Sequence, residues 1–232
     1  MTAIDALKEA MINSGRILVS EDQGDFIFGH VAARLPGDSG LFLMKPHTIG
    51  LEEITPENLI TVNLEGEKVA GDMPRHLEVF IHSEILRVRP DVQAVVHTHA
   101  PHAVAFSALG RPLQPVGHDG AIFCDGLPVF SETSDLIVNQ QRGKAVARAL
   151  GEHNVLMLRN HGIVTVGRTI EEATVLALYL ERACKSQLMV EACGGAAHIS
   201  TSEDAVAKKG RLMPQCCQVF NYLTRRIRSK GI

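Results

Sequence analysis

The chain contains no tryptophan, and its five cysteines are scattered, odd in number and never in a C-x-x-C spacing. This pattern argues against a disulfide framework or a thiolate metal site and favours reduced thiols. No apolar run approaches the roughly 20 residues of a membrane span. The N-terminal segment MTAIDALKEA carries acids where a signal peptide carries bases. We therefore expect a cytoplasmic protein with no membrane partner.

The sequence also lacks an excess of positive charge. Its formal net charge is −3, and its only basic cluster lies at residues 225–230. Phosphate binding needs clustered lysine and arginine, so we expect no nucleic-acid partner. Internal repeats, low-complexity segments and long linkers are missing as well, and 45% of the 232 residues are hydrophobic. These features predict a single domain over residues 1–232.

Hydrophobic periodicity predicts helices that flank a sheet. Segments 25–35 and 40–45 alternate like strands around a turn, which predicts a hairpin. Segments 92–99 and 154–162 are apolar enough for buried strands.

Helix signals stand between and after these strands. Pro74 suits the first turn of a helix that runs through 77–88 and stops at Pro90. Thr169 and Glu172 form a capping box, which predicts the start of a long helix that ends near Gly194. On the earlier helix, Glu84 faces away from Glu78, and we expect it to be solvated.

The strongest chemical signal is the pair His97 and His99 at the end of segment 92–99. Residues two apart on a strand point to the same face, so the two imidazoles converge. Alone, such a pair is often two histidines with ordinary hydrogen bonds. His161 ends the segment before Gly162 and supplies a third imidazole. Three histidines with an open coordination position are a recurrent arrangement for zinc-like ions.

Glu78 and His82 are four residues apart on the predicted helix and share a face. They could act together beside the metal, with Glu78 as acid or base. An exposed glutamate is an equally good interpretation of the spacing, which leaves the two alternatives open.

Several segments together resemble the class II aldolase and adducin head-domain family, over nearly the whole chain. They are Phe28–Arg34, Glu78–His82, Arg89–Val92, Ala94–His99 and Asn160–Gly162. The resemblance implies a three-layer α/β/α fold with a central, mainly antiparallel sheet. It implies that His97, His99 and His161 bind one divalent metal ion and that Glu78 is the acid/base. It also implies a homotetramer with active sites at subunit interfaces. All-histidine ligation favours Zn2+ or Mn2+, with Mg2+, Co2+ or Fe2+ also compatible.

The sequence departs from the family's sugar-phosphate aldolases where those enzymes cradle a phosphate. They usually have Gly-Asn in the first glycine motif and Ser-Ser before the glutamate, whereas this chain has His30 and His76-Leu77. This pattern is similar to a branch that decarboxylates hydroxylated aromatic or heteroaromatic carboxylates. We therefore predict a carbon–carbon lyase of aromatic catabolism with a small-molecule substrate.

Further residues are weaker candidates. The resemblance suggests that His30 is catalytic, donating to a substrate oxygen, although it could be a structural turn histidine. Arg75 or His76 could hold a second substrate carboxylate, since a guanidinium matches a carboxylate well. His82 is a further candidate for substrate binding. Tyr222 could reach a neighbouring subunit's site, but a lone aromatic on a helix usually packs.

Three other functions stay open. An aldolase or epimerase would convert a sugar phosphate or a small hydroxy-ketone. A non-haem iron oxygenase would consume oxygen, because three histidines also bind Fe2+. An adducin-like scaffold would do neither, and the four retained residues disfavour it.

Overall fold

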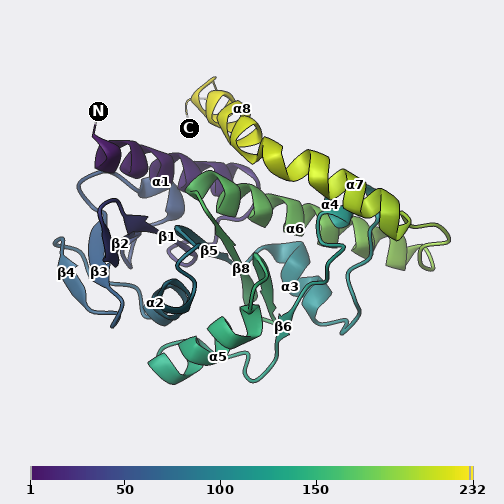
Figure 1. The fold of residues 1–232 in the computed structure, drawn as a ribbon, viewed down its shortest axis with the longest axis horizontal. Coiled ribbons are helices and arrows are strands. Elements are labelled where there is room, and N and C mark those ends of the chain that lie inside the picture. The colour runs from purple at the N-terminus through teal and green to yellow at the C-terminus, as the bar shows by residue number, and fades with distance from the viewer. Residues whose placement is uncertain (1, 230, 232) are drawn as a thin grey trace.

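The computed structural model describes residues 2–229 and 231 (Figure 1). The helices are α1 (Ala3–Ser20), α2 (Val79–Val88), α3 (Pro101–Ser107), α4 (Gly117–Ala121), α5 (Gln140–Leu150), α6 (Ile170–Ala192), α7 (Ser202–Leu212) and α8 (Cys216–Ser229). The strands are β1 (His30–Leu35), β2 (Asp38–Met44), β3 (Ile60–Asn63), β4 (Lys68–Ala70), β5 (Ala94–Thr98), β6 (Val129–Phe130), β7 (Val155–Leu158) and β8 (Gly162–Gly167). Short 3₁₀ turns occur at η1 (Leu51–Glu53) and η2 (Met213–Gln215).

Within the described residues the strands form an eight-stranded sheet of order β4-β3-β2-β1-β5-β8-β7-β6. Neighbouring strands are antiparallel, except that β6 and β7 pair in parallel. Helices α1, α6 and α8 lie on one side of the sheet, and α2 and α5 lie on the other (Figure 1). The predicted α/β/α architecture with a mainly antiparallel sheet is confirmed.

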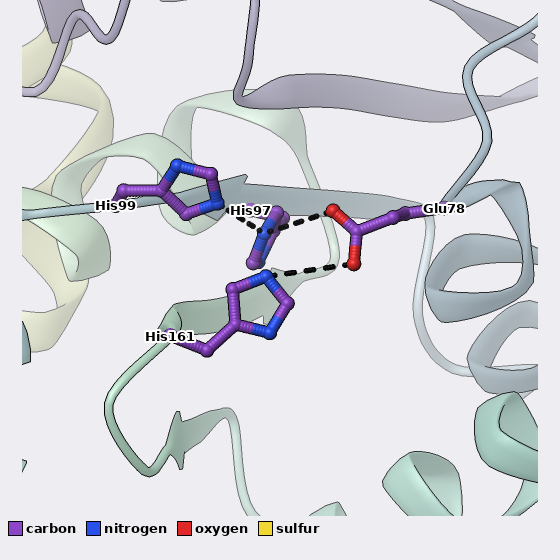
Figure 2. Close-up of side chains that lie close together, drawn as sticks. All are labelled: Glu78, His97, His99 and His161. Atoms are coloured by element: carbon purple, nitrogen blue, oxygen red, sulfur yellow. Dashed lines mark hydrogen bonds and ion pairs between the residues drawn. The ribbon is translucent and has the colours of Figure 1, made fainter. Parts of the chain in front are cut away.

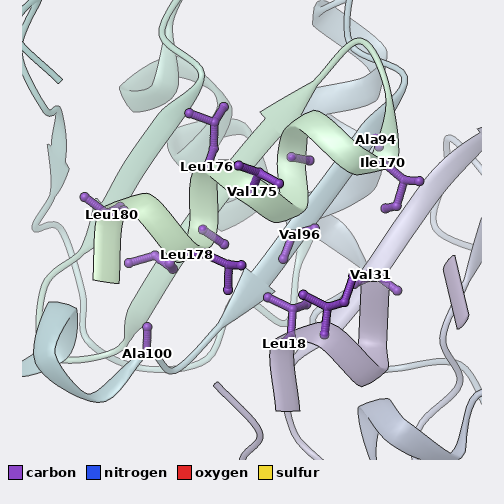
Figure 3. Packing of buried hydrophobic residues seen from close by; sticks show 14 of the residues in the cluster. Leu18, Val31, Ala94, Val96, Ala100, Ile170, Val175, Leu176, Leu178 and Leu180 are labelled. Carbon is purple, nitrogen blue, oxygen red and sulfur yellow. The ribbon is translucent and has the colours of Figure 1, made fainter. Parts of the chain in front are cut away.

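The alternation of side chains along the strands creates a core on each face of the sheet. Ala94 and Val96 of β5 belong to the core under α1 and α6, which Figure 3 shows from close by. Val95 belongs to the other core, under α2 and α5. Because the strand period is two, His97 shares the face of Val95 and looks toward α2.

The predicted hairpin is present as β1 and β2, with Ala33 opposite Leu43. Segment 25–29, however, forms no strand, so that part of the prediction is wrong. Gly29 has a φ of 64°, a left-handed conformation that glycine adopts without strain. The chain turns there, and β1 starts at the next residue, His30. His30 pairs with His97 of the neighbouring strand β5.

Helix α2 begins later than Pro74, which corrects the predicted start. Glu78 is its N-cap, and the backbone N–H of Glu78 donates to Nδ1 of His76 at 3.4 Å. Residues 74–76 are not helical and 77–78 form a turn, so this segment adds no turn to the helix.

The prediction that Glu84 is solvated is also wrong, since it is only 1% exposed. Helix α5 approaches α2 closely at Gly143, where an added Cβ would lie 2.5 Å from the carbonyl oxygen of Phe80. This approach covers Glu84, whose nearest cation is the Nε of Arg87 at 3.5 Å.

Helix α6 starts as predicted. Thr169 is its N-cap and accepts a hydrogen bond from the backbone N–H of Glu172. In a capping box, the Glu172 carboxylate would accept from the backbone N–H of Thr169. Here it accepts from the backbone N–H of Arg168, so the capping box is shifted by one residue. No helix among the described residues, the long α6 included, is apolar over a length that could cross a membrane.

Arg34, at a half-buried position on β1, connects this strand to neighbouring segments through its guanidinium. It donates to the carbonyl oxygens of Leu86 at 2.8 Å and Val92 at 3.3 Å, and also to Ser39. One side chain thus ties β1 to the end of α2 and to the start of β5. These are the elements that carry the histidine and glutamate candidates.

We expect Arg34→Met to lower the free energy of unfolding by about 2–4 kcal/mol, because the carbonyl oxygens of Leu86 and Val92, two buried residues, lose a donor. Urea unfolding of the purified protein measures this loss. Arg148→Met, at an exposed position on α5, is the control and should change it by less than about 0.5 kcal/mol. Equal effects of the two substitutions would contradict the structural role of Arg34.

Candidate metal centre

Four side chains from different parts of the chain meet at one end of β5 (Figure 2). Glu78 comes from the N-cap of α2, His97 from β5, His99 from the next turn and His161 from the residue before β8. One ligand atom from each lies within 4.8 Å of the others. The structure therefore brings together the residues that the sequence proposed as metal ligands and acid/base.

His161 is not at the end of a strand, as its sequence context suggested, but in the tight turn between β7 and β8. Asn160 has a φ of 57° in this turn. The next residue, Gly162, packs so closely that an added Cβ would lie 2.5 Å from the carbonyl oxygen of Thr98 and 3.0 Å from Cδ2 of His99. Glycine is therefore what allows the third imidazole to approach the other two.

Hydrogen bonds fix the protonation of two of the imidazoles. Nδ1 of His97 lies 2.9 Å from the carbonyl oxygen of Ile163, and Nδ1 of His99 lies 2.7 Å from Oδ2 of Asp25. Both partners are acceptors, so each Nδ1 carries a proton, and in the neutral ring each Nε2 then keeps its lone pair. Such outer partners orient metal-binding histidines and favour their ligand form.

The geometry fits a divalent cation. Nε2 of His97 and Nε2 of His99 are only 3.2 Å apart, which is hydrogen-bond distance when one of them carries a proton. When both rings carry their single proton on Nδ1, both Nε2 lone pairs point into the same space, where a divalent cation could accept them. Burial lowers the pKa of His97 well below its usual value, which keeps the ring in its neutral, ligand form. Among the described residues, neither ring nitrogen of His161 has a hydrogen-bond partner.

Glu78 is buried beside the three imidazoles, and its two oxygens have different surroundings. Oε1 accepts from the backbone N–H of Ile137 at 2.8 Å and lies 3.5 Å from Nε2 of His161. Oε2 lies 3.8 Å from Nε2 of His97 and 3.9 Å from Nε2 of His30. Burial raises the pKa of Glu78, but the imidazoles of His161, His30 and His97 within 4 Å outweigh it and leave the pKa well below its usual range. The carboxylate is therefore ionised, with one oxygen anchored and the other facing the histidines.

A second group of histidines adjoins the first, with the ring centroids of His30 and His97 4.9 Å apart. His30, His76 and His82 are all buried, and the rings of His30 and His76 are 4.1 Å apart between centroids. Nδ1 of His30 lies 2.5 Å from Nε2 of His82. Burial lowers the pKa of His76 and of His82 to about 3, so both rings are neutral near pH 7.

Arg75 and Tyr222 do not join these clusters in this chain. The Arg75 guanidinium lies over the Phe80 ring, 5.6 Å from its centroid, and donates to the carbonyl oxygen of His76. Tyr222 is 54% exposed on α8, which lies on the far side of α1 and α6 from α2 (Figure 1).

Sequence reasoning missed three residues near the metal centre. Asp25 accepts a hydrogen bond from His99 although the two residues are 74 positions apart, so no local sequence pattern indicates the contact. Phe28 is 44% exposed with its ring centroid 6.4 Å from that of His99. Lys45 is fully buried and donates to the carbonyl oxygen of Ile27, and burial lowers its pKa to about 8. The only signal for Lys45 was a cation at the end of an apolar strand.

Curated relatives of the chain include decarboxylases. Decarboxylase NovR of Streptomyces niveus is 35% identical over 172 residues, which cover 73% of this chain and 64% of that protein. The 3,4-dihydroxyphthalate decarboxylase of Arthrobacter keyseri is 30% identical, with 82% and 80% covered. The chain spans less than two thirds of the length of several of its most similar curated relatives.

A solved structure and a family model agree with this relationship. The L-fuculose 1-phosphate aldolase from Glaciozyma antarctica superposes with a TM-score of 0.85 at 28% identity, covering 99% of this chain and 94% of that one. Residues 9–188 match the family model described as Class II Aldolase and Adducin N-terminal domain. The match covers most of the chain, and the protein therefore belongs to the class II aldolase and adducin family.

Proposed function

We propose that this protein is a metal-dependent carbon–carbon lyase that removes CO2 from a hydroxylated aromatic or heteroaromatic carboxylate. The observation that carries the proposal is the buried, ionised carboxylate of Glu78 placed 3.8 Å from Nε2 of His97, in a cluster with two more imidazoles. Decarboxylases among the relatives support the reaction type. His30 and His76 in place of small hydrogen-bonding residues favour a substrate without a phosphate.

His97, His99 and His161 would hold one divalent ion, with Zn2+ or Mn2+ favoured by the all-nitrogen ligand set. When bound, such an ion polarises oxygen ligands and stabilises the negative charge that develops as a carbon–carbon bond breaks. Burial keeps His97 neutral.

Glu78 would manage the proton. Its ionised Oε2 takes the proton of the substrate's ring hydroxyl and then delivers it to the ring carbon that bears the carboxylate. The bond from that carbon to the carboxylate breaks, its electron pair restores the aromatic ring, and CO2 leaves. The product phenolate takes a proton from solvent on release, so one proton is consumed overall.

The surrounding side chains suit an aromatic acid. Phe28 presents a flat, half-exposed ring beside His99, against which a substrate ring can pack. We propose that His30 contacts a substrate oxygen and that His76 or Arg75 holds a second carboxylate. His82, which is fully buried against His30, would support substrate binding through that ring.

The assembly is also a proposal. Tyr222 is exposed on α8 and could complete the site of a neighbouring subunit in a homotetramer. We further propose that residues 1–232 act as one domain in the cytoplasm, where free thiols such as those of the described cysteines stay reduced.

The main alternative is an aldolase or epimerase that acts on a sugar phosphate or a small hydroxy-ketone, as the likeness to an L-fuculose 1-phosphate aldolase suggests. The same centre would stabilise an enediolate in that reaction. An Fe2+ oxygenase would consume O2, and an adducin-like scaffold would need no metal. These functions are separated by measuring CO2 release from ortho-hydroxylated benzoates, phthalates and pyridine carboxylates with the metal-loaded protein. If none of these compounds releases CO2, the result favours aldol chemistry.

Two substitutions should separate metal binding from proton transfer. We expect His97→Ala to lose bound metal and turnover together, because it removes the most buried ligand. We expect Glu78→Gln to keep the metal and the hydrogen bond from Ile137 but to lose about 100-fold or more in kcat, because an amide cannot carry the proton. Metal content by mass spectrometry and CO2 release measure the two effects. His118→Ala, at an exposed position on α4, is the matched control. A Glu78→Gln variant with full activity would rule out the proposed acid/base.

Asp25 should set metal affinity without touching the ion. Asp25→Asn removes the negative acceptor of His99 Nδ1–H, and we expect the dissociation constant for Zn2+ to rise about 10- to 100-fold. Competition with a chelating dye measures this constant. Asp38→Asn, in the exposed start of β2, is the control. If the dissociation constant for Zn2+ is unchanged in the Asp25→Asn variant, the Asp25–His99 contact does not orient a ligand.

A further inference from the structure

The short contact between His30 and His82 joins two fully buried rings that lie 52 residues apart in the sequence. Both rings are 0% exposed, and the loss of solvation disfavours a charged imidazolium. Each ring therefore has a single N–H. Nδ1 of His30 and Nε2 of His82 are 2.5 Å apart, so one of these nitrogens carries a proton and the other a lone pair.

The surroundings of the two outer nitrogens decide which ring donates. If His30 donated, the proton of His82 would sit on Nδ1, which is buried without a partner among the described residues. The lone pair of His30 Nε2 would then face the Glu78 carboxylate, whose Oε2 is 3.9 Å away. If His82 donates, only a lone pair stays unpaired on His82, and the N–H of His30 Nε2 faces the carboxylate. A buried donor without an acceptor and two facing negative dipoles both disfavour the first arrangement.

We propose that His82 is a positioning residue that fixes His30 as the neutral tautomer with its proton on Nε2. His82 donates from Nε2 to Nδ1 of His30, and His30 presents its own N–H to Oε2 of Glu78 and to a substrate oxygen bound beside it. The kinetic part of this inference rests on the proposed function, but the tautomer itself does not.

The same tautomer argues against a second metal ion in this part of the site. His30, His76 and Glu78 offer ligand atoms within 4.8 Å of one another, which is close enough to suggest one. The backbone N–H of Glu78 donates to Nδ1 of His76, so a neutral His76 also carries its proton on Nε2. Protonated nitrogens donate hydrogen bonds and cannot coordinate a cation. The inference therefore predicts one ion per chain.

The tautomer can be read directly from zinc-loaded protein labelled with ¹⁵N-histidine, by two-bond ¹H–¹⁵N correlations that distinguish protonated from bare ring nitrogens. His30→Gln identifies the signals of His30. We expect Nε2 of His30 to be protonated and Nδ1 to be bare. A proton on Nδ1 of His30 would overturn the proposal, whether or not any substrate is decarboxylated.

Two variants test the consequence in the same protein. Gln at position 82 keeps an N–H near the place of Nε2, whereas Met fills similar space with no donor. On the substrate that the wild-type protein decarboxylates, we expect His82→Met to lower kcat about 10- to 100-fold. His82→Gln should recover most of that loss. Metal content should stay at one ion per chain and the melting temperature should be alike in both variants. Equal kcat losses in the two variants, or a second bound ion that His76→Phe removes, would contradict the inference.

Discussion

Nε2 of His97 and Nε2 of His99 lie 3.2 Å apart, with the buried Glu78 carboxylate next to them. When the two rings carry their protons on Nδ1, electron-rich atoms of all three side chains point into one space, which is unfavourable unless a positive charge lies there. Much of the nearby structure serves to maintain it. Ile163 and Asp25 hold the outer nitrogens of the two rings. A divalent cation held by these groups would stabilise negative charge that develops on a bound molecule.

The sheet determines where these groups meet. His30 and His97 are direct neighbours on β1 and β5, and the strand period turns both toward α2. Glu78 stands at the N-cap of α2, so the helix delivers its carboxylate between the two histidine groups. One group has bare Nε2 atoms and suits a metal, whereas the other presents N–H donors. A single carboxylate therefore lies between an expected cation and a set of neutral hydrogen-bond donors.

Local patterns in the sequence predicted part of this arrangement. The alternation in segment 92–99 placed His97 and His99 on one face, and the Thr169 cap located the start of α6. Family resemblance added Glu78 and His161. The bend at Gly29, the late start of α2 and the burial of Glu84 depend on packing between distant segments, as with Gly143 against Phe80. The contacts of Asp25 with His99 and of His82 with His30 span 74 and 52 residues, and spacing alone carries no signal for them.

The most direct test of the central claim is X-ray absorption spectroscopy of the zinc-loaded protein and of its His97→Ala variant. The account predicts a zinc ion whose nearest shell contains imidazole nitrogens from three histidines, and loss of stoichiometric zinc binding in the variant. A shell dominated by thiolate, or a variant that binds zinc with unchanged affinity and spectrum, would contradict a metal centre built on His97, His99 and His161.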